Sequence, residues 1–288
     1  MLSAKLSAKS IGKMKDMGLL AALLAAMVAL VGGAGCDSSS NNANAQSVVD
    51  LDDASIIVEV NATDGDAGFQ IFLDGEGWED VDVSDPSMNL IFESIASGGI
   101  LEIGGGTELF LETEEPEFEE AGDLQDLLDL LPEGQYTFSG TTAEGDELTG
   151  TAELTHLLPC GPEVVSPAEA AILDTANPIS ISWESVEEEI DTETSTADDV
   201  VCVASAELVI ENYQVIVEDE ESGNVFDVVL SDEATSVTVP EEFFEEDTLY
   251  KFEILAIEES GNQTITESFF CTGPDGPGDA GEPCPEPE

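Results

Sequence analysis

The sequence contains no arginine, and it has few lysines and one histidine. Asp and Glu number 65 against five Lys and Arg together, and four of the five lysines lie within the first fifteen residues. Without residues 1–35, one basic and 64 acidic residues remain, which gives a formal net charge of −63. Because nucleic acids bind proteins chiefly through Lys and Arg, this composition argues against nucleic acid as a partner.

The same scarcity limits catalysis. His156 is the only histidine that a Ser-His-Asp or Cys-His mechanism could use, and its position at the end of a predicted strand favours a surface role. Carboxylates are so numerous that some pair will always have the spacing found in glycosidases, so such a pair is no evidence for glycoside hydrolysis. Without arginine, no clamp for phosphate or carboxylate substrates is evident. The sequence therefore predicts no catalytic residue and no enzyme.

Cysteine is scarce too, and its spacing excludes the usual zinc motifs. The five cysteines are Cys36, Cys160, Cys202, Cys271 and Cys284, with no C-x-x-C pair among them. With a single histidine available as well, a structural zinc site is not expected. The last four cysteines could form two disulfides in any of three connectivities, or remain free thiols.

The N-terminal segment has the layout of an export signal. Lysines up to Lys15 precede an apolar run at 19–31, which ends in Gly33-Ala34-Gly35-Cys36. This ending resembles the bacterial lipoprotein signal, although Gly33 stands where that family usually has Leu or Val. The resemblance implies a signal peptide at 1–35, a lipid on Cys36, and a membrane-anchored protein that faces the periplasm or the cell surface. An uncleaved membrane helix and ordinary signal cleavage are the alternatives.

Residues 36–53 are predicted to form a flexible tether, because Ser, Asn and Ala follow Cys36 without periodicity. From 54 to 158 the pattern predicts an all-β domain of the immunoglobulin-like sandwich type. Its short apolar stretches, separated by Gly, Asp and Pro, are 57–60, 69–73, 90–92, 109–111, 136–138 and 151–154. One amphipathic helix is expected where Leu124, Leu127, Leu128 and Leu131 recur at helical spacing before Pro132.

Residues 159–272 predict a second sandwich with a more specific pattern. Ile179-Ser180-Ile181-Ser182-Trp183 alternates into a tryptophan, a strand follows at 213–217, and Tyr250, Phe252, Ile254 and Ala256 alternate before Gly261. This series resembles the fibronectin type III repeat. The resemblance implies that Trp183 and Tyr213 lie in the core and that Tyr250 forms a tyrosine corner, its hydroxyl bonded to nearby backbone.

The resemblance also bears on the cysteines. In the family, the entry to the domain and the loop after the tryptophan strand lie at the same pole. It therefore implies a Cys160–Cys202 disulfide and leaves Cys271 for Cys284 in the Gly/Pro-rich acidic tail, residues 273–288. The segment 184–211, which carries Cys202, departs from the family because it is longer than the usual loop.

One turn offers a possible cation site. Asn61, Asp64 and Asp66 surround Gly65, and alternating Asp and Asn oxygens can converge on calcium, with Asp74 and Glu76 as possible further ligands. The segment lacks the full EF-hand pattern. Asp, Asn and Gly are also the residues that an ordinary hairpin turn selects. Calcium is thus the one cofactor that the sequence suggests, and the turn is the simpler interpretation.

Together these features predict an anchored, exported and non-enzymatic module for binding, scaffolding or adhesion, with an unknown protein or polysaccharide as its ligand. Fold resemblance carries only associational weight for such a function. A calcium-dependent or carbohydrate-binding surface protein is the first alternative. An accessory part of an exported hydrolase is the second, and it would require a pocket with converging carboxylates.

Overall fold

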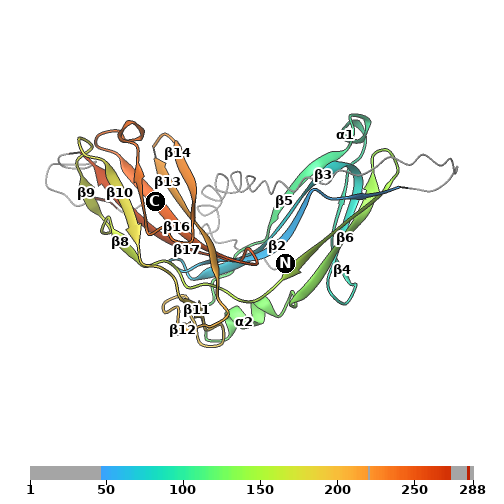
Figure 1. Cartoon of the computed structure of the whole chain (residues 1–288), viewed down its shortest axis with the longest axis horizontal. Helices are drawn as coiled ribbons and strands as arrows, with labels where there is room; N and C mark the ends of the chain where they lie inside the picture. Colours follow the sequence, from blue (N-terminus) through green and yellow to red (C-terminus); the bar gives the residue numbers. More distant parts are fainter. Residues whose placement is uncertain (1–46, 220, 274–283, 286–288) are drawn as a thin grey trace, which may run out of the picture. The chain divides into compact units, whose positions relative to one another are not determined.

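The computed structural model describes residues 47–219, 221–273 and 284–285 (Figure 1). The predicted signal peptide, Cys36, most of the predicted tether and most of the acidic tail lie outside the described residues. Within the described residues, no helix has both the length and the apolar character that crossing a membrane requires.

The N-terminal half, residues 48–154, is built around one long strand. Its strands are β1 (Val48–Asp50), β2 (Asp53–Asn61), β3 (Asp66–Ser84), β4 (Leu90–Ile95), β5 (Gly106–Glu112), β6 (Gly134–Thr142) and β7 (Glu147–Leu154), and its helices are α1 (Gly99–Glu102) and α2 (Asp123–Leu128). The first part of β3 pairs with β2 and β5, and its second part pairs with β4 and β6. Strand β3 therefore connects two sets of neighbours within one sheet.

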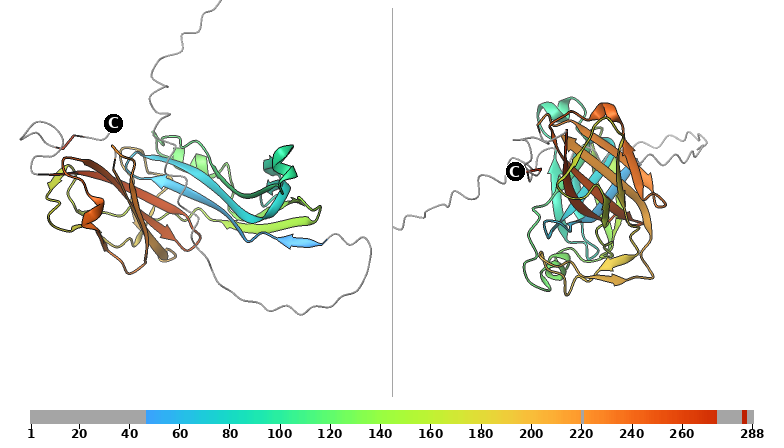
Figure 2. Two further views of the ribbon diagram at one scale, coloured as in Figure 1. Left: turned by 90° about the horizontal axis from the view of Figure 1, so that it is seen from above. Right: turned by 90° about the vertical axis from the view of Figure 1, so that its left-hand side faces the viewer.

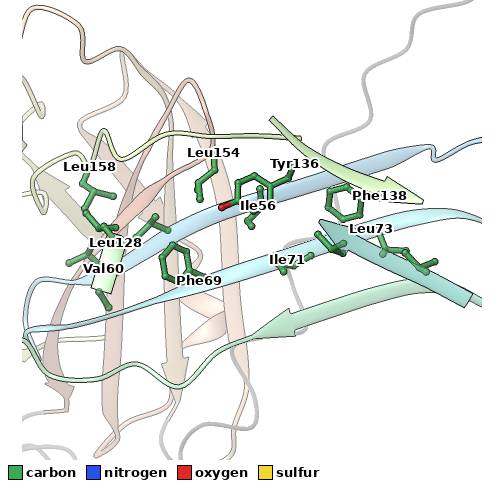
Figure 3. Close-up of a cluster of buried hydrophobic side chains, with 14 of the residues drawn as sticks. Ile56, Val60, Phe69, Ile71, Leu73, Leu128, Tyr136, Phe138, Leu154 and Leu158 are labelled. Atoms are coloured by element: carbon green, nitrogen blue, oxygen red, sulfur yellow. The ribbon is translucent and has the colours of Figure 1, made fainter. Parts of the chain in front are cut away.

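Alternation along these strands explains the core of this half. In β2 and β3, every second residue points to one face, and those residues are apolar and buried. Figure 3 shows Ile56, Phe69, Ile71 and Leu73 from these strands meeting Tyr136 and Phe138 of β6. Leu124 and Leu128 of α2 are fully buried in the same cluster. The predicted helix is therefore present, and its leucines cover this core.

The C-terminal half, residues 164–272, is a sandwich of two sheets. Its strands are β8 (Val164–Ser166), β9 (Ala171–Leu173), β10 (Ile179–Trp183), β11 (Glu188–Ile190), β12 (Cys202–Ala204), β13 (Ile210–Asp219), β14 (Val225–Ser231), β15 (Ser236–Val239), β16 (Leu249–Glu258) and β17 (Gln263–Thr272). A three-stranded sheet of β15, β10 and β8 packs over the run β17, β16, β13 and β14. Their shared interior holds alternate residues from both sheets, which is the sandwich arrangement.

The two halves share a hydrogen-bonded sheet, with the strand order β1-β7-β6-β3-β2-β17-β16-β13-β14. Strands β2 and β17 pair in parallel, with Glu59 opposite Gln263 and Asn61 opposite Ile265. Figures 1 and 2 show the blue β2 beside the dark orange β17. The all-β prediction is confirmed, and the parallel β2–β17 pairing, called the seam below, is a feature that the sequence analysis did not predict.

The predicted boundary of the tether is wrong at its end. Residues 48–50 form β1, which pairs in parallel with β7, and Leu51 packs against the N-terminal core. Leu51 lies close over Gly75 and Gly150, where a side chain would collide with it. Three apolar residues in this short segment supply enough contact to join the sheet, although the segment is too short to show a periodic pattern.

Candidate functional site

Aromatic residues frame the interior of the C-terminal half. The rings of Trp183 and Tyr213 lie 5.4 Å apart, and both side chains are buried. The Tyr213 hydroxyl accepts a hydrogen bond from the Val186 backbone N–H at 2.8 Å. The Tyr250 hydroxyl accepts one from the Glu245 N–H, also at 2.8 Å and five residues upstream, while its ring stacks on Phe270. A tyrosine that bonds to backbone just upstream is the tyrosine corner of such sandwiches.

The C-terminal half has a fibronectin type III-like fold. Its three-stranded sheet packed on the run β17-β16-β13-β14 of the shared sheet, its tryptophan on β10 and its tyrosine corner on β16 support this assignment. Trp183, Tyr213 and Tyr250 serve the core of this type III-like half, so they are structural residues rather than parts of a binding surface.

Both disulfides that the resemblance implied are present. Cys160 and Cys202 are joined with their Cα atoms 6.1 Å apart, and Cys271 and Cys284 with theirs 5.6 Å apart. The first bridge attaches the β11–β12 hairpin, part of the long 184–211 segment, to the connection between the halves. Backbone bonds support it, because Cys160 N–H donates to Glu188 O and Ile190 N–H donates to Leu158 O.

The turn predicted to bind calcium has the geometry of a hairpin turn. Asn61 Oδ1 accepts hydrogen bonds from the N–H groups of Thr63 and Asp64, and Asn61 Nδ2 donates to Glu267 Oε1 at 2.8 Å. These bonds make an Asx turn, which asparagine commonly forms. Asp74 lies eight residues beyond Asp66 along β3, on the order of 25 Å for extended chain. One ion could not contact both.

A different group of acids converges beside this turn. The carboxylates of Glu59 on β2, Glu112 on β5 and Glu115 just after β5 each place one oxygen within 4.8 Å of the others. Gly68 on β3 makes room for Glu115 of these three residues, since a Cβ there would lie 2.8 Å from Glu115 Cγ. This set of three residues is called the glutamate cluster below.

Two buried amides contact the glutamate cluster. Gln263 on β17 donates its Nε2 to Glu59 Oε2 in a short hydrogen bond, and Gln70 on β3 donates its Nε2 to Glu112 Oε1 at 3.2 Å. Gln70 is 5% exposed and Gln263 is fully buried. The Oε1 atom of each amide is buried and has no hydrogen-bond partner. An unpaired buried carbonyl is unusual, because it loses its bond to water without replacement.

Burial and like charge shift the acidity of the cluster. Burial, followed by the charges of Glu115 and Glu112, raises the pKa of Glu59 to about 8. Burial raises the pKa of Glu115 to about 7, with further contributions from Glu112, Asp66 and Asp64. The predicted turn therefore lies near the cluster and adds to its negative field.

The single cation of the described residues does not neutralise the cluster. Lys251 on β16 pairs with Glu267 at 2.8 Å and with Glu253 at 3.5 Å. Glu253 is 3% exposed, and burial raises its pKa to about 7 even though Lys251 acts in the opposite direction. Glu253 and the cluster thus belong to a region with more carboxylates than positive charge.

Glu253 gives a pH-dependent prediction. The folded protein keeps the Glu253 proton up to about pH 7, while the unfolded chain loses it near pH 4.5, so the folded state binds more protons between these values. The free energy of unfolding should therefore fall as pH rises from 5 to 8. Glu253→Gln should remove on the order of 2–3 kcal/mol of this decline. Urea denaturation at several pH values in EDTA would measure it.

Glu246→Gln is the matched control, because Glu246 is exposed and carries the same charge. It should leave the slope of stability against pH close to that of the wild type. Parallel profiles for wild type and Glu253→Gln would contradict a retained proton on Glu253.

His156 has a structural contact. Its ring Nε2 lies 2.9 Å from the Leu131 carbonyl, which can only accept, so Nε2 carries the proton. Its backbone N–H donates to Glu133 Oε1 at 2.8 Å. The histidine thus ties the start of the connection after β7 to the segment that follows α2.

A buried asparagine holds the seam. Asn262, in the turn before β17, is fully buried, and its Oδ1 accepts a hydrogen bond from the Val58 N–H on β2 at 2.8 Å. Its Nδ2 lies 3.0 Å from the carbonyl oxygens of Thr155 and Leu157, in the connection between the halves. One side chain therefore joins β2, the connection and the type III-like half.

Sequence reasoning missed both the glutamate cluster and Asn262. Their members come from strands far apart in the chain, so no spacing along the sequence marks them. One local signal existed, because Glu59 and Gln70 are polar residues within otherwise apolar stretches of β2 and β3.

No known protein family matches the sequence, and no curated protein matches it either. Among solved structures, it is similar to the FN1–FN3 domains of chicken CNTN1, with 11% identity, a TM-score of 0.29, and coverage of 78% of this chain and 65% of that one. The structure of a bacterial ice-binding adhesin is 14% identical, with a TM-score of 0.26, and the match covers 80% of this chain and 66% of that one. A chicken tenascin segment with two fibronectin type III domains shares 9% with a TM-score of 0.25, covering 78% and 97%.

The chain thus covers less than two thirds of each of the first two structures. At these identities and TM-scores, the likeness carries no argument about function. The fold assignment rests on the strands and contacts described above.

Proposed function

We propose that this chain is an exported lipoprotein, anchored through Cys36, that binds another exported protein and carries out no catalysis. The two disulfides support export, because such bonds persist in oxidising compartments. The signal-like segment that ends at Cys36 supports the anchor.

The observation that carries the binding role is an apolar, weakly charged stretch on an otherwise acidic chain. Residues 88–103 contain only two acids, and Ile95, Ile100 and Ile103 are 62%, 54% and 82% exposed. Exposed aliphatic side chains gathered in one segment are typical of protein contact surfaces. The segment spans β4 and α1, which follow the second part of β3 (Figure 1).

The aromatic residues favour a protein over a polysaccharide as the ligand. Sugar rings are commonly held on the exposed face of Trp or Tyr. Both tryptophans, Trp78 and Trp183, and all three tyrosines are buried. Aliphatic side chains remain for contact, and these suit an apolar surface on another protein.

The anchor is tested by expressing the full chain in a bacterium that processes lipoproteins, with a labelled fatty acid in the medium. The wild type should carry the label and sediment with membranes, and Cys36→Ser should lose the label and leave the membrane fraction. An unlabelled or soluble wild type would refute the anchor.

The binding surface is tested by placing a photocrosslinking amino acid at position 103 in cells of the bacterium that encodes the chain. One discrete crosslinked protein should form, and the added substitution Ile95→Asp should reduce its yield at least fivefold. Val165 is the matched control position, because it is 56% exposed on β8 in the other half. Equal crosslinking at 103 and 165 would contradict a dedicated surface.

A further inference from the structure

The three acids of the glutamate cluster lie beside two buried amides, those of Gln70 and Gln263, at the seam. Glu59 and Gln263 face each other across the parallel β2–β17 pair, and Gln70 and Glu112 face each other across β3 and β5. Strand pairing alone therefore brings these side chains from four strands to one place. Glu115 completes the group by lying over Gly68.

The cluster lacks a positive partner within the described residues. Lys251 is the only basic side chain there, and it is engaged by Glu267 and Glu253. Carboxylates withdrawn from water require compensation, because burying a charge without a partner is very unfavourable. Either protons or a bound cation must supply the missing positive charge.

The unpaired amide oxygens point to a cation. A proton on a carboxylate could satisfy at most one amide oxygen, whereas one cation can take the three carboxylates and both unpaired Oε1 atoms, of Gln70 and of Gln263, as ligands together. Glutamine carbonyl oxygens are calcium ligands, as are carboxylates. Both amides already contact the cluster through Nε2, so a small rotation or an exchange of the amide's O and N brings a carbonyl oxygen toward it.

The spacing suits calcium. Calcium binds oxygen at about 2.3–2.6 Å, so oxygens on opposite sides of the ion lie about 4.6–5.2 Å apart. The three carboxylate oxygens lie within 4.8 Å of one another. Magnesium, at about 2.0–2.1 Å, demands near-ideal octahedral geometry and keeps several waters, so carboxylates and amides fixed on strands suit the more flexible coordination of calcium better.

We propose that Glu59, Glu112 and Glu115 bind a calcium ion at the β2–β17 seam, with the amides of Gln70 and Gln263 as supporting ligands. This site differs from the Asn61–Asp66 turn, whose asparagine oxygen is occupied by backbone N–H groups. The bound ion would link β2, β3 and β5 to β17, and so would stabilise the two halves against each other.

The proposal is tested with the purified full-length chain in detergent, stripped with EDTA and kept in 0.5 M potassium chloride to suppress diffuse binding to the acidic surface. Calorimetric titration with calcium should show one saturable site. The midpoint of thermal unfolding should rise by several degrees at millimolar calcium and less at equal magnesium.

Glu115→Gln should weaken calcium binding at least tenfold and remove the rise in midpoint. Glu114→Gln is the matched control, because Glu114 is its exposed neighbour and loses the same charge. Glu112→Gln, at a partly buried position, provides a second test if Glu115→Gln folds poorly, which circular dichroism would reveal.

Three results would overturn the proposal. The first is the absence of saturable binding by the wild type. The second is equal binding by Glu115→Gln and Glu114→Gln, which would mean that the acidic surface binds calcium diffusely. The third is a wild type whose midpoint depends on pH but not on calcium, which would mean that the cluster holds protons only.

Discussion

Removal of the Cys160–Cys202 disulfide, by the double substitution Cys160→Ala and Cys202→Ala, is expected to lower the free energy of unfolding by about 4 kcal/mol. The bridge closes a loop of 42 residues. In the chain-entropy account, such a cross-link stabilises the fold because it restricts the unfolded chain, and the effect grows slowly with the size of the loop.

The loss should be concentrated in the β11–β12 hairpin. This hairpin has three residues in each strand, and it contacts the connection through a few backbone bonds such as that of Cys160 N–H to Glu188 O. A short two-stranded hairpin is marginally stable by itself. Limited digestion with a glutamate-specific protease should therefore cleave within 184–211 much faster in the double variant. Denaturant unfolding would measure the total loss.

The second disulfide provides the control. Cys271 and Cys284 are separated by only 13 residues, so their joint replacement by alanine should cost about 3 kcal/mol. It should leave cleavage in the hairpin unchanged. A larger loss from the shorter loop, or equal protease sensitivity in both variants, would contradict this account.

The strands could be predicted because their signals are local. Alternate apolar positions mark β10 and the first half of β16, an apolar and β-branched run marks β13, and the leucine spacing marks α2. Trp183 and Tyr250 could be assigned to the core for the same reason, since each lies within an alternating strand. The strands and core aromatic residues of the type III-like half could thus be predicted from the sequence pattern.

Contacts between distant segments could not be predicted in this way. Strand β3 continues for 19 residues, from Asp66 to Ser84, well beyond the apolar stretch 69–73 that marks it in the sequence. The pairing of β2 with β17 joins residues about 200 positions apart, and no pattern in either strand specifies its partner. The glutamate cluster depends on the pairing of β3 with β2 and β5, and its contact with Gln263 depends on the β2–β17 pairing, so the sequence pattern does not predict either.

Asn262→Ala is expected to destabilise the protein by about 3 kcal/mol or more, although Asn262 belongs to a turn. The substitution leaves the Val58 N–H and the carbonyl oxygens of Thr155 and Leu157 without their partner. Each unsatisfied buried group costs about 1–3 kcal/mol, reduced where water can enter. Urea unfolding would give the total, and hydrogen exchange at the Val58 amide would report the local effect.

Two variants make the interpretation specific. Asn262→Asp keeps an oxygen for Val58 but cannot donate to the two carbonyls, so it should be at least as destabilising as alanine. Asn224→Ala changes an exposed asparagine in the β13–β14 turn and should stay within about 0.5 kcal/mol of the wild type. If Asn262→Ala unfolds like the wild type and Val58 stays protected from exchange, the seam is held by the β2–β17 backbone bonds and does not need this side chain.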